Sequence, residues 1–200
     1  DFADTDMHGF QAQCPYLAYH YNRVWVNGTP GGGDDETTLD LEWSTATANS
    51  RGAYVDTSFV WVYEAAQGFG DFGTLFNQIA NDNYVRIVNI SYGLNESYLN
   101  GFGLVSSWHS IFNQMLGQGM TIMAAAGDSG ATAGCGDSIA LLYPGSDPDV
   151  VSVGGTALQT SIYGFSSEVA WTGGTSTGSC SHNNGGTGGG CSVLFSAPGY

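Results

Sequence analysis

The apolar stretch MTIMAAAGDSG, residues 120–130, indicates a buried strand that ends in a tight turn. Residues 120–126 are apolar apart from one threonine, which is typical of a strand covered on both faces in a parallel sheet. Gly127 and Gly130 permit close backbone approach around Asp128. Because such sheets bind ligands beyond the carboxyl ends of their strands, Asp128 is a candidate site residue. The alternative is that Asp128 only caps a turn.

Strand and helix patterns alternate on both sides of this stretch. Further strands are predicted from the β-branched and aromatic runs at 58–65, 84–93 and 149–158. Two amphipathic helices are predicted from apolar residues at steps of three and four. Their stripes are Leu75, Phe76, Ile79 and Ala80, and then Leu104, Val105, Trp108, Ile111, Phe112 and Met115. The alternation predicts an α/β fold, with a mostly parallel sheet flanked by helices on both faces.

The composition restricts the classes of partner. The chain has 200 residues, 42% of them hydrophobic, which excludes a disordered chain and suits one domain. Its formal net charge of -15, with three Arg and no Lys, excludes a role on nucleic acid or on an anionic membrane. The many carboxylates of the chain also repel each other, and this repulsion decreases as they gain protons, which favours function at acidic pH. No signal peptide or apolar run of membrane-spanning length is present, so we expect a soluble chain, already processed if it is secreted.

The cysteines and one sequon favour a secreted or lumenal protein. There are four cysteines, and Asn95-Glu96-Ser97 is an acceptor motif for N-glycosylation. Cys180 and Cys191 flank a Gly-rich stretch that a local disulfide would close, and the alternative is a zinc site that includes His182. The partners of Cys14 and Cys135 stay open.

The stretch GGGDDETTLDLEW, residues 31–43, predicts an acidic helix. Asp34 or Asp35 fits the first turn, where the helix dipole favours acids. Glu36 and Asp40 lie four residues apart, so they share one helical face and repel each other. If a stripe of Leu39, Trp43 and Ala46 packs against the sheet, the pair becomes partly buried and shares a proton, which raises an apparent pKa and makes a general base. The alternative is a solvated acidic face.

The sequence contains no motif for a Ser-His-Asp relay. The four histidines lie outside any recognisable signature, and each is interpreted as structural or exposed: His8, His20, His109 and His182. The glycines at 31–33 form no phosphate loop, because the required Lys and Ser/Thr are missing.

Four motifs in order resemble the sedolisin family of serine-carboxyl peptidases: ETTLDLE at 36–42, NISYG at 89–93, AAAGDSG at 124–130 and VSVGGTAL at 151–158. The family has a subtilisin-like α/β fold and cleaves peptides at acidic pH. The resemblance implies that Glu36 is the general base toward a serine, that Asp40 is hydrogen-bonded behind it, and that Asp128 takes the oxyanion-hole position. Carboxyl groups would then replace imidazole.

The resemblance also implies a substrate-binding strand end at Ser91, Tyr92 and Gly93. The family usually has Ser-Trp-Gly there, so Tyr92 departs from the pattern. Residues 1–200 resemble only the middle of the catalytic domain. The first strand, the catalytic serine and the calcium ligands are therefore expected outside this chain, and no metal ligands are predicted within it. A Gly-Gly-Thr-Ser sequence at 173–176 follows the VGGT strand too closely, so Ser176 is not interpreted as the nucleophile.

The leading hypothesis is an acid-acting serine-carboxyl endopeptidase, nicked so that a second chain supplies the serine. Its substrate would be a protein or peptide, and its location secreted or in a lysosome-like acidic compartment. Three alternatives remain open. They are a tripeptidyl exopeptidase, a noncatalytic secreted binding or storage module with a subtilisin-like sheet, and a self-contained hydrolase that uses Ser176.

Overall fold

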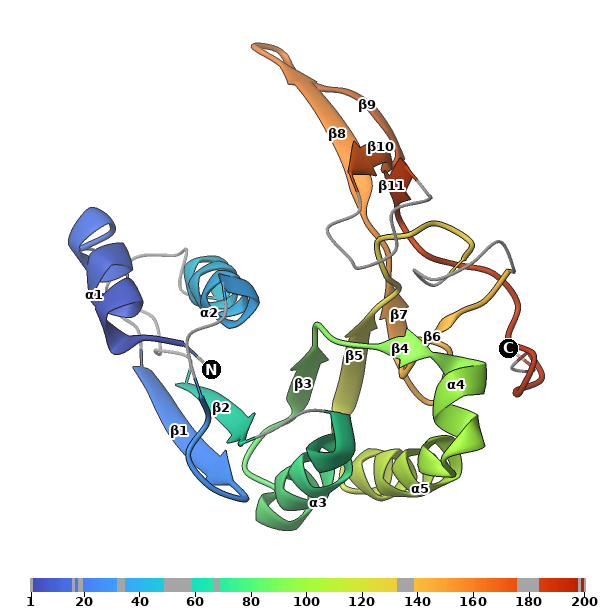
Figure 1. The fold of residues 1–200 in the computed structure, drawn as a ribbon. Helices are drawn as coiled ribbons and strands as arrows, with labels where there is room; N and C mark the ends of the chain where they lie inside the picture. Colours follow the sequence, from blue (N-terminus) through green and yellow to red (C-terminus); the bar gives the residue numbers. More distant parts are fainter. Residues whose placement is uncertain are drawn as a thin grey trace. The chain divides into compact units, whose positions relative to one another are not determined.

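The structure is a computed structural model (Figure 1). It describes residues 2–15, 17, 20–31, 35–48, 59–66, 69–132, 139–175, 184–197 and 199. The chain divides into two compact units, Asp1–Val85 and Arg86–Tyr200, and each is described by itself.

The first unit contains a two-stranded parallel sheet with helices. Its elements are α1 (Asp4–Gln13), β1 (His20–Val26), α2 (Asp35–Ala48), β2 (Phe59–Ala65), the 3-10 helix η1 (Phe69–Asp71) and α3 (Phe72–Asp82). Strands β1 and β2 pair in parallel from His20 opposite Phe59 to Val26 opposite Ala65. Helix α3 packs against both strands. The predicted strand at 58–65 and helix at 73–82 are confirmed, whereas α1 and β1 were not predicted.

A small apolar core and one buried ion pair hold this unit together. Its core cluster joins four buried residues, Phe2, Met7, Leu41 and Val62. Glu64, with a side chain only 2% exposed, accepts hydrogen bonds from Arg23 Nε at 2.8 Å and Nη2 at 2.9 Å. These bonds raise the pKa of Arg23. A buried carboxylate needs such a partner, because an unpaired charge there costs several kcal/mol.

Helix α2 buries a different face from the predicted one. Leu39 is 48% exposed and Trp43 67% exposed, whereas Leu41 and Thr45 are each 3% exposed. Leu41 contributes to the core cluster, and α2 packs against α1. The predicted stripe of Leu39, Trp43 and Ala46 packing against the sheet was therefore wrong.

The second unit is built on a three-stranded parallel sheet in the order β3-β5-β7. Its elements are β3 (Ile87–Ile90), β4 (Leu94–Asn95), α4 (Glu96–Gly101), α5 (Leu104–Gly117), β5 (Thr121–Ala125), β6 (Leu142–Tyr143), β7 (Val151–Val153), β8 (Thr156–Ser161), β9 (Gly164–Ala170), β10 (Thr172–Thr175) and β11 (Asn184–Gly186). The unit also contains three antiparallel strand pairs, which are β4 with β6, β8 with β9, and β10 with β11.

Most elements predicted in this unit are confirmed. Strands β3 and β5 lie within the predicted runs, and α5 packs against β5. The predicted stripe of α5 is buried at Val105, Trp108, Ile111, Phe112 and Met115. The run at 149–158 forms two strands, β7 and β8, separated at Gly154 and Gly155. The parallel sheet is thus confirmed, and its coverage by helices on both faces stays a prediction.

Candidate active site

Helix α2 carries the two acids predicted to form the general base. Glu36 and Asp40 stand four residues apart in a continuous helix, so they lie about one turn apart on one face, and both are partly buried. Asp35 is exposed in the first turn, as the helix dipole favours, and Asp34 lies outside the described residues.

Asp128 lies on the loop that follows β5, with an exposed side chain. Glycines flank it, with φ +102° at Gly127 and +61° at Gly130. Both values favour glycine, because a Cβ is strained in that region. The sequence predicted a glycine-flanked acid at the carboxyl end of an apolar strand, and this position is confirmed. Its role in catalysis stays a prediction.

A distant segment holds this loop through backbone hydrogen bonds. Gly186 N donates to Asp128 O at 2.9 Å, Gly130 N to Gly186 O at 2.8 Å, and Gly188 N to Gly127 O at 2.7 Å. A Cβ at Gly188 would collide with the carbonyl oxygen of Ala126. The backbone around Asp128 is therefore packed against a second glycine-rich segment, residues 186–188, which fixes the position of the Asp128 backbone.

Ser91, Tyr92 and Gly93 follow β3, the direct neighbour of β5 in the parallel sheet. They and Asp128 therefore lie beyond the carboxyl edge of the same sheet, where ligand sites of α/β sheets form. Ser91 Oγ accepts a hydrogen bond from Asn89 Nδ2 at 3.1 Å, and Tyr92 is 36% exposed. A Cβ at Gly93 would lie only 3.0 Å from Tyr143 O, so glycine favours the close approach of these two segments.

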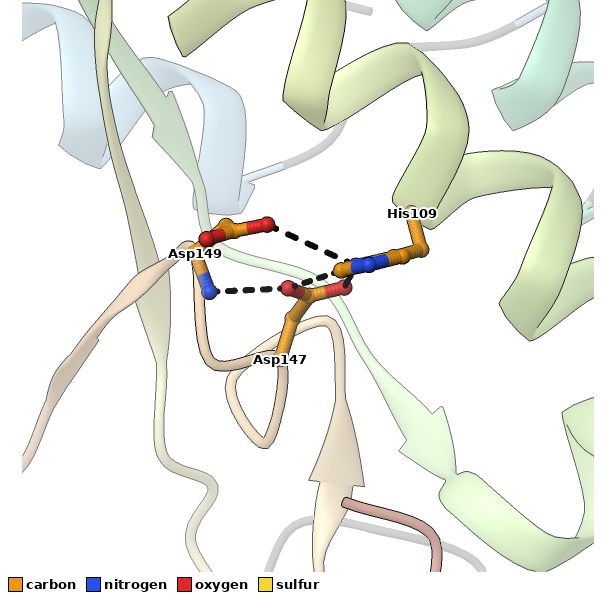
Figure 2. Close-up of side chains that lie close together, drawn as sticks. All are labelled: His109, Asp147 and Asp149. Atoms are coloured by element: carbon orange, nitrogen blue, oxygen red, sulfur yellow. Dashed lines mark hydrogen bonds and ion pairs between the residues drawn. The ribbon is translucent and has the colours of Figure 1, made fainter. Parts of the chain in front are cut away.

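One polar cluster was missed by the sequence analysis. His109 on α5 lies beside Asp147 and Asp149, which come from the loop between β6 and β7 (Figure 2). The prediction that His109 is structural or exposed is incomplete, since it is half-buried and bonded to an acid. No local signal connects residues 38 positions apart in sequence. His8 and His20 are exposed, and His182 lies outside the described residues.

The markers of secretion have mixed outcomes. Cys14 and Cys191 carry free thiols, and Cys135 and Cys180 lie outside the described residues, so the Cys180–Cys191 disulfide is not shown. Asn95 caps α4, because its Oδ1 accepts hydrogen bonds from the N–H groups of Ser97 and Tyr98. Ser176 lies outside the described residues. Within the described ranges, no helix is long and apolar enough to cross a membrane.

Comparison with known proteins agrees with the fold and the motifs. Residues 29–183 match the model of the subtilase family. Sedolisin of Pseudomonas sp. (strain 101) is 31% identical over 172 residues, which cover 80% of this chain and 28% of sedolisin. Kumamolisin of Bacillus sp. (strain MN-32) is 31% identical over 176 residues, covering 86% of this chain and 29% of kumamolisin.

The solved structure of Pseudomonas sedolisin, a serine-carboxyl proteinase complexed with two molecules of pseudo-iodotyrostatin, is similar at a TM-score of 0.78 and 25% identity. The match covers 97% of this chain and 55% of that chain. The chain thus has the subtilisin-like fold, and it spans under a third of the length of sedolisin and kumamolisin. From the family match and these relatives, we conclude that the chain belongs to the subtilase family and is related there to the sedolisin-type serine-carboxyl peptidases.

Proposed function

We propose that this chain is part of a serine-carboxyl endopeptidase that cleaves proteins or peptides in acid. The observation that carries the proposal is the placement of Glu36 and Asp40 on one face of α2, both partly buried. Relatives that are serine-carboxyl peptidases align over most of the chain, which supports the same chemistry.

Glu36 acts as the general base. Its carboxylate takes the proton from a serine hydroxyl while the serine oxygen attacks the peptide carbonyl carbon, and it later returns that proton to the departing amine. Asp40 shares a proton with Glu36 and holds it in position. The pair carries one negative charge before it accepts the serine proton and is neutral afterwards, so it takes the part of general base that imidazole has in ordinary serine peptidases.

Asp128 serves as the oxyanion donor. In its protonated form it donates a hydrogen bond to the oxygen of the tetrahedral intermediate, and a carboxyl group kept neutral is an established donor of this kind. Its exposed position after β5 and its two flanking glycines support the assignment. Activity then requires an ionised Glu36 and a protonated Asp128, so turnover rises and falls within the acid range.

Ser91, Tyr92 and Gly93 bind the substrate backbone beside Asp128. They follow the neighbouring parallel strand, and extended peptides commonly bind along such exposed strand ends. Tyr92 is 36% exposed, so its ring is accessible to a bound peptide.

We further propose that the remaining parts of the active site lie outside residues 1–200. We assign the nucleophilic serine to a second chain of a nicked, secreted protein, and the calcium ligands to that same missing part. Catalysis by the described residues includes no step through the calcium ion. Covering of the central sheet by helices on both faces is also part of this proposal.

The first experiment identifies the native partner. Material purified from its source is denatured, with and without reduction, and analysed by intact mass and terminal sequencing. A second peptide that contains Gly-Thr-Ser supports the two-chain peptidase. A 200-residue chain found alone, with no peptide cleavage, favours the noncatalytic binding module. Cleavage by the chain alone that is lost in Ser176→Ala favours the self-contained hydrolase.

The second experiment tests the carboxyl groups in the complete enzyme. Glu36→Gln and Asp128→Ala should each lower turnover by about 100-fold or more, because bases and oxyanion donors typically contribute that much. Glu42→Gln is the matched control, since it makes the same chemical change on the same helix. Turnover like that of the wild type in either site variant would contradict the assignment. An equal loss of turnover in Glu42→Gln would show that removing any negative charge from α2 lowers turnover, and would also contradict it.

Substrates with a blocked N-terminus separate the two kinds of peptidase. An endopeptidase cleaves them internally, whereas a tripeptidyl exopeptidase needs a free amino terminus and releases three residues at a time. Internal cleavage of a blocked peptide is the expected result.

A further inference from the structure

The cluster of His109, Asp147 and Asp149 has ligand atoms of the kind and spacing that metal sites use. Nδ1 of His109 lies 3.0 Å from Asp147 Oδ2 and 3.1 Å from Oδ1, and 3.7 Å from Asp149 Oδ2. One ligand atom from each residue fits within 4.8 Å of the others. Figure 2 shows both carboxylates turned toward the imidazole edge.

Asp147 is held in place before any ligand binds. Its side chain is fully buried. Tyr143 Oη donates to Oδ2 at 2.7 Å, and the backbone N–H of Asp149 donates to Oδ1 at 2.9 Å. Burial, then the charge of Asp147, raises the pKa of Tyr143 and keeps its hydroxyl a donor. Each carboxylate oxygen still has a second acceptor site, because an ionised carboxyl group offers about four lone pairs.

The cluster lacks enough positive charge of its own. Among the described residues, the ion pairs of Asp147 and Asp149 are with His109 alone. The two carboxylates lie on either side of one imidazole, and that of Asp147 is out of contact with water, where a charge without a full partner is costly. A cation between the three side chains would remove this cost.

We propose that His109 Nδ1, one oxygen of Asp147 and one of Asp149 bind a divalent transition-metal cation of the zinc class, with water as the remaining ligand. Tetrahedral zinc with bonds of about 2.1 Å places neighbouring ligand atoms about 3.4 Å apart. The observed 3.0 and 3.7 Å lie on either side of that spacing. The imidazole ligand favours zinc over calcium or magnesium, which prefer oxygen alone. His109 and Asp149 are partly exposed, which leaves a path for the ion.

Asn113, one turn after His109 on α5, affects how strongly the imidazole binds a metal. Its Nδ2 lies 3.1 Å from His109 Nε2 and 3.0 Å from His109 O. When Nδ1 binds a metal, Nε2 carries the ring proton, so two donors face each other and the exposed amide must turn away. A carboxylate at position 113 would accept that proton and orient the ring, as carboxylates behind metal-bound histidines do.

The test measures binding, so it does not depend on peptidase activity. Zn²⁺ is titrated by calorimetry into the complete protein that contains this chain, near neutral pH, and Co²⁺ is added separately to record its visible d–d absorption. We expect one Zn²⁺ per chain, unaffected by excess Ca²⁺. His109→Gln and Asp149→Asn should weaken binding by about 100-fold, and Asn113→Asp should strengthen it by about 10-fold, the usual scale of ligand and outer-partner effects.

Matched controls are His8→Gln and Glu42→Gln, which remove an exposed histidine and an acid elsewhere; both should bind like the wild type. Circular dichroism checks that each variant is folded. If His109→Gln unfolds, the test depends on Asp149→Asn, because Asp149 is partly exposed and its substitution disturbs the fold less. The proposal is overturned if Zn²⁺ affinity stays within twofold of the wild type in Asp149→Asn, or if excess Ca²⁺ displaces the Zn²⁺. Failure of the peptidase assignment leaves this result unchanged.

Discussion

Helices α2 and α5 have the same length and opposite relations to the core. Each contains 14 residues. Helix α5 buries five large apolar side chains, whereas α2 buries only Leu41 and Thr45 and leaves Trp43 67% exposed. In α5 nearly all the apolar side chains stabilise the fold. In α2 two carboxyl groups and a large aromatic ring remain at least partly exposed, so this helix retains groups that other molecules can contact.

The largest expected effect is in the buried helix. Trp108 is 2% exposed and its ring stacks 5.9 Å from that of Tyr143. Trp108→Ala should lower the free energy of unfolding by about 3–5 kcal/mol, because it removes a large buried ring and leaves a cavity. Urea unfolding of the 200-residue chain measures it. A loss below about 1 kcal/mol would mean that α5 is not the structural helix.

An intermediate effect is expected where α5 contacts the loop before β7. Tyr143 is fully buried, and its hydroxyl contacts Asp147 Oδ2 at 2.7 Å and Val105 O at 3.1 Å. Tyr143→Phe should cost about 1–3 kcal/mol at neutral pH, because Asp147 loses a buried donor. Thermal unfolding at pH 7 measures the loss.

The same substitution changes the response to alkali. Burial, and then the charge of Asp147, raises the pKa of Tyr143 in the folded chain above its ordinary value of 10.0. Above pH 10 the unfolded chain therefore releases a proton that the folded chain retains, so alkaline pH favours unfolding. Stability should fall less steeply above pH 10 in Tyr143→Phe than in the wild type. Denaturant titrations at pH 10 and 11 measure the change in the free energy of unfolding. An equal change in Tyr143→Phe and in the wild type would contradict the burial of this hydroxyl.

The smallest effect is expected in α2. Trp43→Ala makes the same chemical change as Trp108→Ala at a largely exposed ring, so the free energy of unfolding should change by no more than about 0.5 kcal/mol. Its main value is the direct contrast between two tryptophans. If both substitutions cost the same, exposure does not distinguish the two helices.

The contrast also explains which parts of the fold were predictable from sequence. In α5 the apolar residues at 105, 108, 111, 112 and 115 are large and regularly spaced, so the periodicity predicted the buried face. In α2, Asp40 and Glu42 alternate with the apolar Leu39, Leu41 and Trp43, so no helical stripe stands out, and packing against α1 selected the face of Leu41. Strand β1 has the sequence HYNRVWV. The polar residues His20, Asn22 and Arg23 interrupt its apolar pattern, so the sequence did not predict a strand there.

Local patterns predicted only those site features that one segment defines. The shared helical face of Glu36 and Asp40 and the strand-end position of Asp128 each depend on a few consecutive residues. The cluster of His109 and Asp147 depends on tertiary packing between α5 and a later loop, so no local pattern indicates it. The run at 149–158 was taken as one strand because its apolar character continued through the glycines that divide it.

The glycine contacts around Asp128 have a consequence for biosynthesis. The loop after β5 is held by backbone bonds to residues 186 and 188, and a side chain at 188 would not fit beside Ala126. A growing polypeptide on the ribosome therefore cannot complete this loop until Gly188 has left the exit tunnel. Folding of this loop thus waits for the translation of residues 186–188, and a nascent chain that stops before them carries Asp128 on an unfinished turn.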